Sequence, residues 1–534
     1  MVPACQFRQL RPNLLPSVKG DAQVTTPQTS VSYPADYTEL LARLATVHDL
    51  HAASAVLGWD QMTYLPAGSG GPRGRHLATL TRLAHEHFTD DRIGVLLDNL
   101  SSFEASLASD SDEASLLRVA RQDHGRAVRV PGSFMATFAE HQSASYQAWT
   151  VARPANDWKA VTPILERTVE LSREYAGFFP RTNHLADVFV DEAEPGLDVE
   201  AVRALFSSLR ARLVPMVRQI VAQARPDDTF LTRVYPVDTQ WQFGEMIARK
   251  LGYDFERGRQ DRAPHPFTTS FSRNDVRITT RLSETDLRFG LFATMHEAGH
   301  GMYEQGVAPG LDGTLLGSGA SSGVHESQSR LWENVVGRSR GFWKWGYPRL
   351  QTTFPGQLGD VSADQFYRAI NRVEPSLIRV EADEMTYNLH IMMRFDFELA
   401  LLDGSLRVAD LPDAWNARFK DDLGITPATN QDGCMQDVHW FASPIAGQFQ
   451  GYTIGNVLSA QCFDRACEVH PSIPSEIESG EFGSLLAWLH TNLHALGRKY
   501  DVNDTIVRAT GRPLTIEPYL AYLKAKFGDL YDLS

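Results

Sequence analysis

The segment His296-Glu297-Ala298-Gly299-His300 has the residue types and the spacing of a metal-dependent hydrolytic site. In a helix, residues four apart differ by about 40° in azimuth, so His296 and His300 project from one face and can share a tetrahedral cation. Glu297 follows His296 directly, which places its carboxylate beside a metal-bound water, where a general base is needed. Because the pattern is short and the chain has 17 histidines, a surface helix with incidental histidines is the competing interpretation.

A catalytic metal site of this type needs a third protein ligand and leaves the fourth position open. The longer pattern H-E-x-x-H-x-x-G-x-x-H supplies a third histidine, but here Gln305-Gly306 lies in that region and the next histidine is His325. We therefore expect a carboxylate from a second helix. The segment that begins at Val324 offers His325, Glu326 and Glu333, and spacing alone does not choose among them.

Helices must supply most of the framework for these residues. Between Asp36 and Leu50 the apolar residues recur at helical spacing. Similar patterns predict further helices at 75–98, 112–126, 133–151, 159–178 and 199–224. The chain is therefore predicted to be mainly α.

A hairpin is predicted just before the histidine-bearing helix, because residues 267–282 alternate in polarity around a turn at 272–275. The Gly- and Ser-rich segment 310–323 predicts a loop, and helical spacing returns over 324–336. The buried face of the histidine-bearing helix is expected to consist of the apolar residues Phe289, Leu291, Phe292 and Met295.

The bulk composition is that of a globular protein, with 43% hydrophobic and 22% charged residues in 534. A formal net charge of -14 argues against a general nucleic-acid binder, and no apolar run approaches the roughly 18 residues of a membrane span. Four cysteines form no disulfide framework, which favours a reducing, cytoplasmic compartment.

The N-terminal segment, residues 1–34, is expected to be separate from a catalytic domain at 35–534. It contains Arg8, Arg11 and Lys19 with a single acid, Asp21, and lacks the apolar core of a secretory signal. A disordered leader, a misassigned start codon and an organellar targeting peptide are the three interpretations of this composition.

Beyond the first motif, the chain resembles the M32 family of metallocarboxypeptidases, the thermostable carboxypeptidase Taq type. The resemblance rests on motifs in family order, which are Trp59-Asp60-Gln61-Met62-Thr63-Tyr64-Leu65-Pro66, His265-Pro266-Phe267, Asp275-Val276-Arg277-Ile278-Thr279, the segment 296–300, His325-Glu326-Ser327-Gln328, Ile378-Arg379-Val380-Glu381-Ala382-Asp383 and Gly433-Cys434-Met435-Gln436-Asp437-Val438-His439-Trp440. It extends from about residue 36 to the C-terminus. It implies a single helical body with a deep central cleft, a small β-sheet beside the metal site, and a homodimer.

The resemblance also implies roles for particular residues. Glu326 becomes the third metal ligand, and Glu333 becomes an outer or structural residue. Arg379 would hold the terminal carboxylate of the substrate, for which a planar guanidinium is suited; the alternative for Arg379 is a buried salt bridge to Glu381 or Asp383.

Further residues of the same motifs are expected near the substrate. His265, Gln436 and Asp437 are placed among the substrate-binding residues, although Asp437 could instead orient a histidine or cap a turn. His439 and Tyr452 are the expected donors to the oxyanion. The chain departs from the family here, because it has Phe-Gln-Gly-Tyr before and at Tyr452 where members often have Phe-Pro-Thr-Tyr.

Together these features predict a zinc-dependent carboxypeptidase that acts on peptides with a free C-terminal carboxylate, with Glu297 as general base. Cobalt is an alternative ion, because a His₂Glu ligand set suits several divalent metals. An endopeptidase or dipeptidase with the same metal site, a catalytically silent peptide-binding protein and a structural zinc site are the alternatives.

Overall fold

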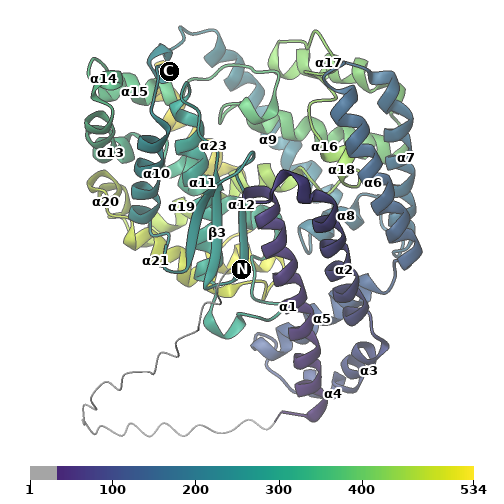
Figure 1. Ribbon diagram of the computed structural model, residues 1–534. Coiled ribbons are helices and arrows are strands. Elements are labelled where there is room, and N and C mark those ends of the chain that lie inside the picture. Colours follow the sequence, from purple (N-terminus) through teal and green to yellow (C-terminus); the bar gives the residue numbers. More distant parts are fainter. Residues whose placement is uncertain (1–32, 534) are drawn as a thin grey trace, which may run out of the picture.

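The computed structural model describes residues 33–533, so the predicted leader lies outside the described residues except for its last two positions. The chain forms a largely helical body with one small sheet (Figure 1). The helices of its first half are α1 (Ala35–Thr63), α2 (Gly70–Phe88), α3 (Asp91–Asn99), α4 (Ser101–Glu104), α5 (Asp112–Ala127), α6 (Gly132–Ala152), α7 (Trp158–Gly177), α8 (Asp187–Ala193), α9 (Val199–Val221) and α10 (Val237–Leu251).

The second half is also helical, which confirms the prediction of a mainly α fold. Its helices are α11 (Leu287–Gly306), α12 (Ser322–Arg330), α13 (Arg340–Thr353), α14 (Pro355–Leu358), α15 (Ala363–Ile370), α16 (Tyr387–Asp403), α17 (Leu411–Leu423), α18 (His439–Ala442), α19 (Gln450–Val469), α20 (Ile473–Ser479), α21 (Gly483–Asn492), α22 (Val502–Thr510) and α23 (Glu517–Tyr531). Short 3₁₀ turns lie at Ala67–Ser69, Thr229–Thr232, Pro309–Leu311, Arg379–Glu381, Val408–Asp410 and His494–Leu496. The deep central cleft stays a prediction.

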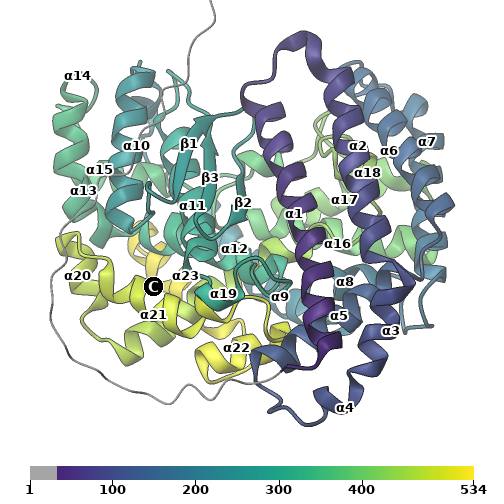
Figure 2. The ribbon, with the colours of Figure 1, turned by 60° about the horizontal axis from the view of Figure 1, so that its bottom comes forward.

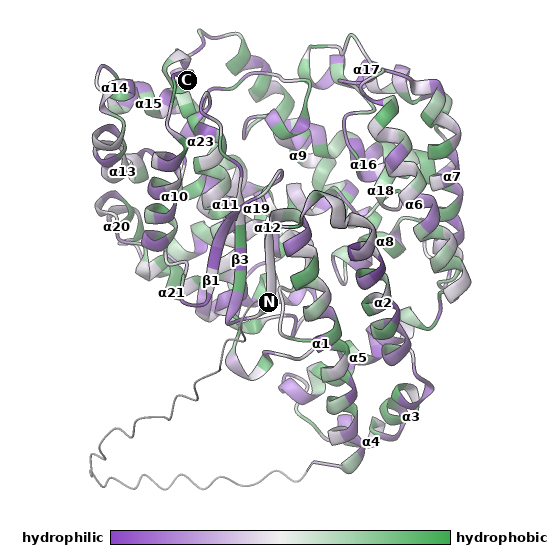
Figure 3. Cartoon of the chain, viewed as in Figure 1, coloured by the Kyte–Doolittle hydropathy of each residue, from purple (hydrophilic) through white to green (hydrophobic). Residues whose placement is uncertain are grey.

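The sheet has the strand order β1 (Gly258–Arg262), β3 (Asp275–Thr280), β2 (Thr268–Ser272). β2 and β3 pair antiparallel, which confirms the predicted hairpin, and β1 pairs parallel with β3. Strand β1 was missed because its sequence is mostly polar and shows no alternation, and Figure 3 shows it hydrophilic beside the more hydrophobic β3.

The predicted helix 75–98 is two helices, α2 and α3, and the prediction of one continuous helix was wrong. The break occurs because the side chain of Asp90 accepts a hydrogen bond from the backbone N–H of Arg92 and begins a new helix there. The predicted helix 324–336 likewise changes character, since α12 ends at Arg330 and a π-helical turn follows at Leu331–Val336.

Helix α11, which carries the two histidines, runs through the centre of the molecule and packs on β3, α10 and α12 (Figure 1). Asp286 caps its N-terminus by accepting from the N–H of Arg288. The expected buried face is confirmed for Leu291, Phe292 and Met295 but was wrong for Phe289, which is 39% exposed. Burial on most sides holds this helix in one position.

Helices α1 and α2 form a hairpin that packs with α1 along strand β2 (Figure 2). The guanidinium of Arg277 lies 4.2 Å from the ring centroid of Trp59, and the hydroxyl of Tyr64 donates to Asp261. These contacts attach the end of the hairpin to the sheet. Within residues 33–533, every helix is too short or too polar to cross a membrane.

Candidate active site

The side chains of His296, His300 and Glu326 converge, with one donor atom of each lying within 4.8 Å of the others. Oε2 of Glu326 is 3.4 Å from Nε2 of His300 and 3.7 Å from Nε2 of His296. Tetrahedral zinc with bonds of about 2.0–2.1 Å separates its ligand atoms by roughly 3.4 Å. Two imidazoles and one carboxylate at these separations fit a divalent cation.

Helices α11 and α12 bring these three side chains together because their backbones approach closely. A Cβ atom on Gly299 would lie 2.7 Å from the carbonyl oxygen of Gln328 and 2.7 Å from Cα of Ser329, so only glycine fits there. On the other side of α12, a Cβ on Gly455 of α19 would meet Glu326 at 2.6 Å. The glycine inside the first motif is therefore a packing requirement of the site.

The other two candidates for the third ligand contact the far nitrogens of the histidines. Oε2 of Glu333 lies 2.9 Å from Nδ1 of His296, and Nδ1 of His325 lies 2.5 Å from Nδ1 of His300. Since a ring cannot bind one ion through both nitrogens, neither residue competes with Glu326 for the position between the two Nε2 atoms. The π-helical turn after α12 places Glu333 on the opposite side of the His296 ring from Glu326.

Glu297 is 5% exposed and is held by the sheet. The hydroxyl of Thr268 on β2 donates to Oε2 of Glu297 over 2.6 Å. Burial raises the pKa of this carboxyl above its ordinary value. The arrangement suits a carboxylate that accepts and returns a proton instead of binding a metal.

Arg379 is 6% exposed, and its charge partner is neither of the two acids considered from the sequence. Its Nε donates to Oδ1 of Asp437 over 2.9 Å, and its Nη1 donates to the hydroxyl of Tyr387 over 3.0 Å. Asp383 instead accepts from the hydroxyl and backbone of Thr386. Arg379 does form a buried salt bridge, but with Asp437. The alternative expected from the sequence, a salt bridge to Glu381 or Asp383, was therefore wrong.

Asp437 pairs with two buried arginines. Its Oδ2 accepts from Nε of Arg394 over 2.6 Å while its Oδ1 accepts from Arg379. Burial alone would raise the pKa of Asp437, but Arg394 and then Arg379 outweigh it and hold the pKa below its usual range. Two guanidinium charges against one carboxylate leave an excess positive charge, which favours an anionic group of a ligand.

Arg330 and Tyr387 connect the metal-ligand cluster to Arg379. Nε of Arg330 donates to Oε1 of Glu326 over 2.7 Å, and its guanidinium lies 4.7 Å from the ring centroid of Tyr387. Sequence reasoning missed both residues, and Thr268 and Arg394 as well. Arg330 could have been found from its position one helical turn after Glu326, whereas Tyr387 carries no such signal.

The side-chain amide of Gln436 forms hydrogen bonds with the backbone of the segment that carries Arg379. Its Oε1 accepts from the N–H of Arg379 over 2.8 Å, and its Nε2 donates to the carbonyl of Leu377 over 2.9 Å. It thereby attaches the Arg379 segment to its own loop. His265 is exposed in the loop between β1 and β2, just before the strand that carries Thr268.

His439 and Tyr452 lie near Arg379. The guanidinium of Arg379 is 5.5 Å from the ring centroid of Tyr452, and Nδ1 of His439 is 3.7 Å from Oδ1 of Asp437. Burial, followed by the charge of Arg379, lowers the pKa of His439 to about 4, so its ring is neutral at physiological pH. Burial raises the pKa of Tyr452, which keeps its hydroxyl protonated.

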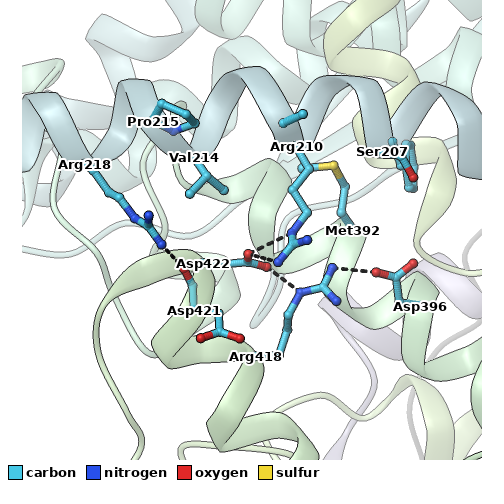
Figure 4. A pocket seen from close by; sticks show the side chains of 12 residues that line it. Ser207, Arg210, Val214, Pro215, Arg218, Met392, Asp396, Arg418, Asp421 and Asp422 are labelled. Carbon is cyan, nitrogen blue, oxygen red and sulfur yellow. Dashed lines mark hydrogen bonds and ion pairs between the residues drawn. The ribbon is translucent and has the colours of Figure 1, made fainter.

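A separate pocket of about 440 Å³ lies between α9, α16 and α17 (Figure 4). Arg418 lies there between Asp422 and Asp396 and donates to both over 2.7 and 2.5 Å, while Arg210 donates to Asp422 over 2.8 Å. Four of its charged groups, Arg210, Arg418, Asp396 and Asp422, are thus paired with one another. None of the candidate site residues lines the pocket. It plays no part in the chemistry considered above.

Comparison with known proteins finds relatives over nearly the whole chain. A family model described as Carboxypeptidase Taq (M32) metallopeptidase matches residues 39–527. Thermostable carboxypeptidase 1 of Thermus thermophilus is 41% identical over 508 residues, which cover 93% of this chain and 99% of that protein. Carboxypeptidase 1 of Bacillus subtilis is 35% identical over 94% of this chain and 99% of its own length.

A solved structure, the M32 carboxypeptidase from Deinococcus radiodurans R1, superposes with a TM-score of 0.91 at 45% identity. It covers 94% of this chain and 100% of its own. Both the sequence and the fold are therefore shared over nearly the whole length. The chain belongs to the M32 family of metallocarboxypeptidases and is a peptide hydrolase of that family.

Proposed function

We propose that this carboxypeptidase is zinc-dependent and removes single C-terminal amino acids, with His296, His300 and Glu326 as the metal ligands and Glu297 as the general base. The observation that carries the proposal is the position of Oε2 of Glu326, 3.4 and 3.7 Å from the two Nε2 atoms. When bound, a zinc ion would polarise both a water molecule and the scissile carbonyl. Cobalt is accepted by the same donor types.

Glu297 takes a proton from the attacking water and returns it to the leaving amine. Its burial favours proton uptake, because the pKa of the carboxyl is raised, and Thr268 fixes the carboxylate orientation. Glu297 follows the ligand His296 directly on α11, so its side chain leaves the helix in a different direction from the two histidines. Its carboxylate therefore does not bind the metal and is free to carry this proton.

Arg379 binds the terminal carboxylate of the substrate. Asp437 faces Nε and Nη2 of Arg379, and the hydroxyl of Tyr387 accepts from Nη1. One further N–H group on each of Nη1 and Nη2 is left to form a bidentate pair with a carboxylate. Asp437 and Gln436 support Arg379, and the excess positive charge favours a carboxylate over a neutral chain. Fixing the terminus beside the metal ligands limits cleavage to the last peptide bond.

His439 and Tyr452 donate hydrogen bonds to the oxygen on which negative charge develops. Both are near Arg379, and both are in the neutral, proton-bearing form at physiological pH. His265 contacts the peptide from the exposed loop before β2. The departure from Phe-Pro-Thr-Tyr leaves the tyrosine itself in place on α19.

We also assign the enzyme to the cytoplasm as a homodimer. Cys434, Cys462 and Cys467 are all free, as expected in a reducing compartment. Light scattering of the full chain after size-exclusion chromatography tests the dimer, and a monomer at micromolar concentration contradicts it. A role of residues 1–34 in organellar targeting stays a prediction, which localisation of the chain with and without them tests.

Two experiments test the proposed mechanism. A short peptide and its C-terminal amide separate a carboxypeptidase, which hydrolyses only the free acid, from an endopeptidase, which hydrolyses both. Glu297→Gln should retain about one zinc per chain and lose roughly 10²- to 10⁴-fold in kcat. Glu256→Gln, at an exposed position, is the matched control.

Three results would contradict the proposal. Wild-type protein without bound zinc contradicts the metal site, and full activity of Glu297→Gln contradicts the general base. Equal hydrolysis of acid and amide contradicts the role of Arg379. If the protein were a catalytically silent peptide-binding protein, the wild type and Glu297→Gln would bind the peptide equally, and neither protein would hydrolyse it.

A further inference from the structure

The ring of His300 is connected to a carboxylate through a second histidine. Nδ1 of His300 lies 2.5 Å from Nδ1 of His325, and Nε2 of His325 lies 2.8 Å from Oε1 of Glu304. Glu304 is buried, and its Oε1 also accepts from the N–H of Gly319 over 3.2 Å. The three side chains therefore form a continuous hydrogen-bonded chain that ends at an anchored acid.

When Nε2 of His300 binds a metal, one arrangement of protons on two neutral rings and an ionised Glu304 satisfies every contact among the three side chains. The Nε2 lone pair of His300 faces Glu326 and the other imidazole, so its proton lies on Nδ1 and is donated to His325. Nδ1 of His325 is then an acceptor, and its proton lies on Nε2 and is donated to Glu304. We infer that His325 and Glu304 are positioning residues, which fix the tautomer and the ring orientation that His300 needs to bind the metal.

The hydrogen-bonded series His300–His325–Glu304, called the relay below, follows from the residue spacing on the two helices of the metal site. His296, His300 and Glu304 follow one another at intervals of four on α11 and so lie along one face. His325 is next to Glu326 on α12. One helix thus supplies two ligands and the final acid, and the other supplies the third ligand and the connecting imidazole.

The relay is closely packed. A Cβ atom on Gly319 would lie 2.6 Å from Cδ2 of His325 and 3.0 Å from Cε1 of Tyr303, and the Tyr303 hydroxyl accepts from the N–H of Ala320 over 3.0 Å. The loop before α12 therefore holds the His325 ring in place. A single methyl group at position 319 would displace that ring without removing any hydrogen-bonding group.

The other histidine ligand is oriented differently. His296 contacts the carboxylate of Glu333 directly, and Arg330 and Arg338 both donate to that carboxylate. On the His300 side, a neutral imidazole separates the ligand from the acid. Each histidine ligand is thus linked to a carboxylate outside the metal site. His296 reaches Glu333 through one hydrogen bond, and His300 reaches Glu304 through two.

This inference rests on the proposed metal ligands, and its test is the zinc dissociation constant of the purified full-length protein, measured by competition with a chromophoric chelator at one pH. His325→Phe removes the acceptor and should weaken zinc binding by about 10- to 100-fold. His325→Asn restores an acceptor near the Nδ1 position and should recover part of the affinity. Gly319→Ala should weaken binding, and Glu304→Gln should do so by less than His325→Phe.

A spectroscopic readout separates orientation from general damage. The visible absorption spectrum of the cobalt-loaded protein should change in His325→Phe and return toward that of the wild type in His325→Asn. His76→Phe, at an exposed position on α2, is the matched control and should leave both the affinity and the spectrum unchanged.

The inference is overturned if folded His325→Phe binds zinc within twofold of the wild type and has the same cobalt spectrum. If His325→Phe does not fold, Gly319→Ala decides, since unchanged zinc affinity there overturns the inference. A wild-type protein that binds no zinc refutes the proposed metal site itself, so the two failures are distinguishable.

Discussion

The hydroxyl of Thr268 lies 2.6 Å from Oε2 of Glu297, so strand β2 and helix α11 meet at the carboxylate that we assign as general base. The same hydroxyl lies 3.1 Å from the backbone carbonyl of Glu297. One small side chain therefore couples the sheet to the centre of the site, and the contribution of the sheet to catalysis can be measured at this position.

Replacing Thr268 with valine should lower kcat by about 5- to 100-fold, because valine keeps the shape but no longer fixes the carboxylate in the position for proton transfer. KM and zinc content should stay unchanged, since neither depends on this bond. Steady-state kinetics with a short peptide measures the effect. Thr268→Ser, which keeps the hydroxyl, is the control, and equal kcat for Thr268→Val and wild type would contradict the role.

Replacing Arg379 with lysine tests whether geometry, beyond charge, selects the terminal carboxylate. Lysine keeps the positive charge but cannot form a bidentate pair while also contacting Asp437 and Tyr387. Loss of one hydrogen bond to a charged group, about 1.5–3 kcal/mol, predicts a decrease of roughly 10- to 100-fold in kcat/KM for free-acid peptides. The exposed Arg407→Lys is the control, and an unchanged kcat/KM would refute the assignment.

Replacing Gly299 with alanine should destabilise the protein and weaken zinc binding together. The new methyl group would meet the backbone of Gln328 and Ser329 at 2.7 Å and would separate α11 from α12, which carry the ligands. Overpacking of this kind costs about 1–3 kcal/mol. Denaturant unfolding and zinc titration measure the two effects. Gly310→Ala, where the Cβ meets nothing within 4 Å, should be nearly neutral, and equal results for both variants would exclude this explanation.

Glu398 predicts a pH dependence of stability that is independent of the metal site. Burial raises the pKa of this carboxyl to about 8, and its Oε1 accepts from Nε1 of Trp440 over 3.0 Å. Between about pH 4.5 and 8 the folded protein holds a proton that the unfolded chain releases, so this group stabilises the fold fully below pH 4.5 and ceases to do so as pH rises through 8. The free energy of unfolding should fall by about 1.4 kcal/mol per pH unit from this source.

Glu398→Gln carries no such proton and should lack this component. The variant should match the wild type near pH 5 and become the more stable of the two by pH 8, as measured by denaturant unfolding at several pH values. Glu478→Gln, on the surface beside Lys344, is the control and should leave the slope unchanged. A constant difference between Glu398→Gln and the wild type at all pH values would show that folding does not raise the pKa of Glu398.

Local patterns were sufficient for much of the fold. The helical spacing of apolar residues predicted α5, α6, α7 and α9 within a few residues of their ends, and the alternation around residues 272–275 predicted the β2–β3 hairpin. The strand β1 escaped because it is short and polar and is defined by its partner β3. Local repetition reveals elements whose burial pattern is regular, and it fails where pairing with a distant segment decides the structure.

The same division holds for the site. Residues four apart in a helix lie on one face whatever the rest of the chain does, so the pairing of His296 with His300 could be predicted from the sequence alone. Spacing left Glu326 and Glu333 as alternatives, and only the family resemblance favoured Glu326. Tertiary structure puts Glu326 between the two Nε2 atoms and Glu333 behind His296, and it pairs Arg379 with Asp437. The reason is that helix geometry sets short-range positions residue by residue, whereas contacts between helices depend on how whole faces pack, which no local spacing encodes.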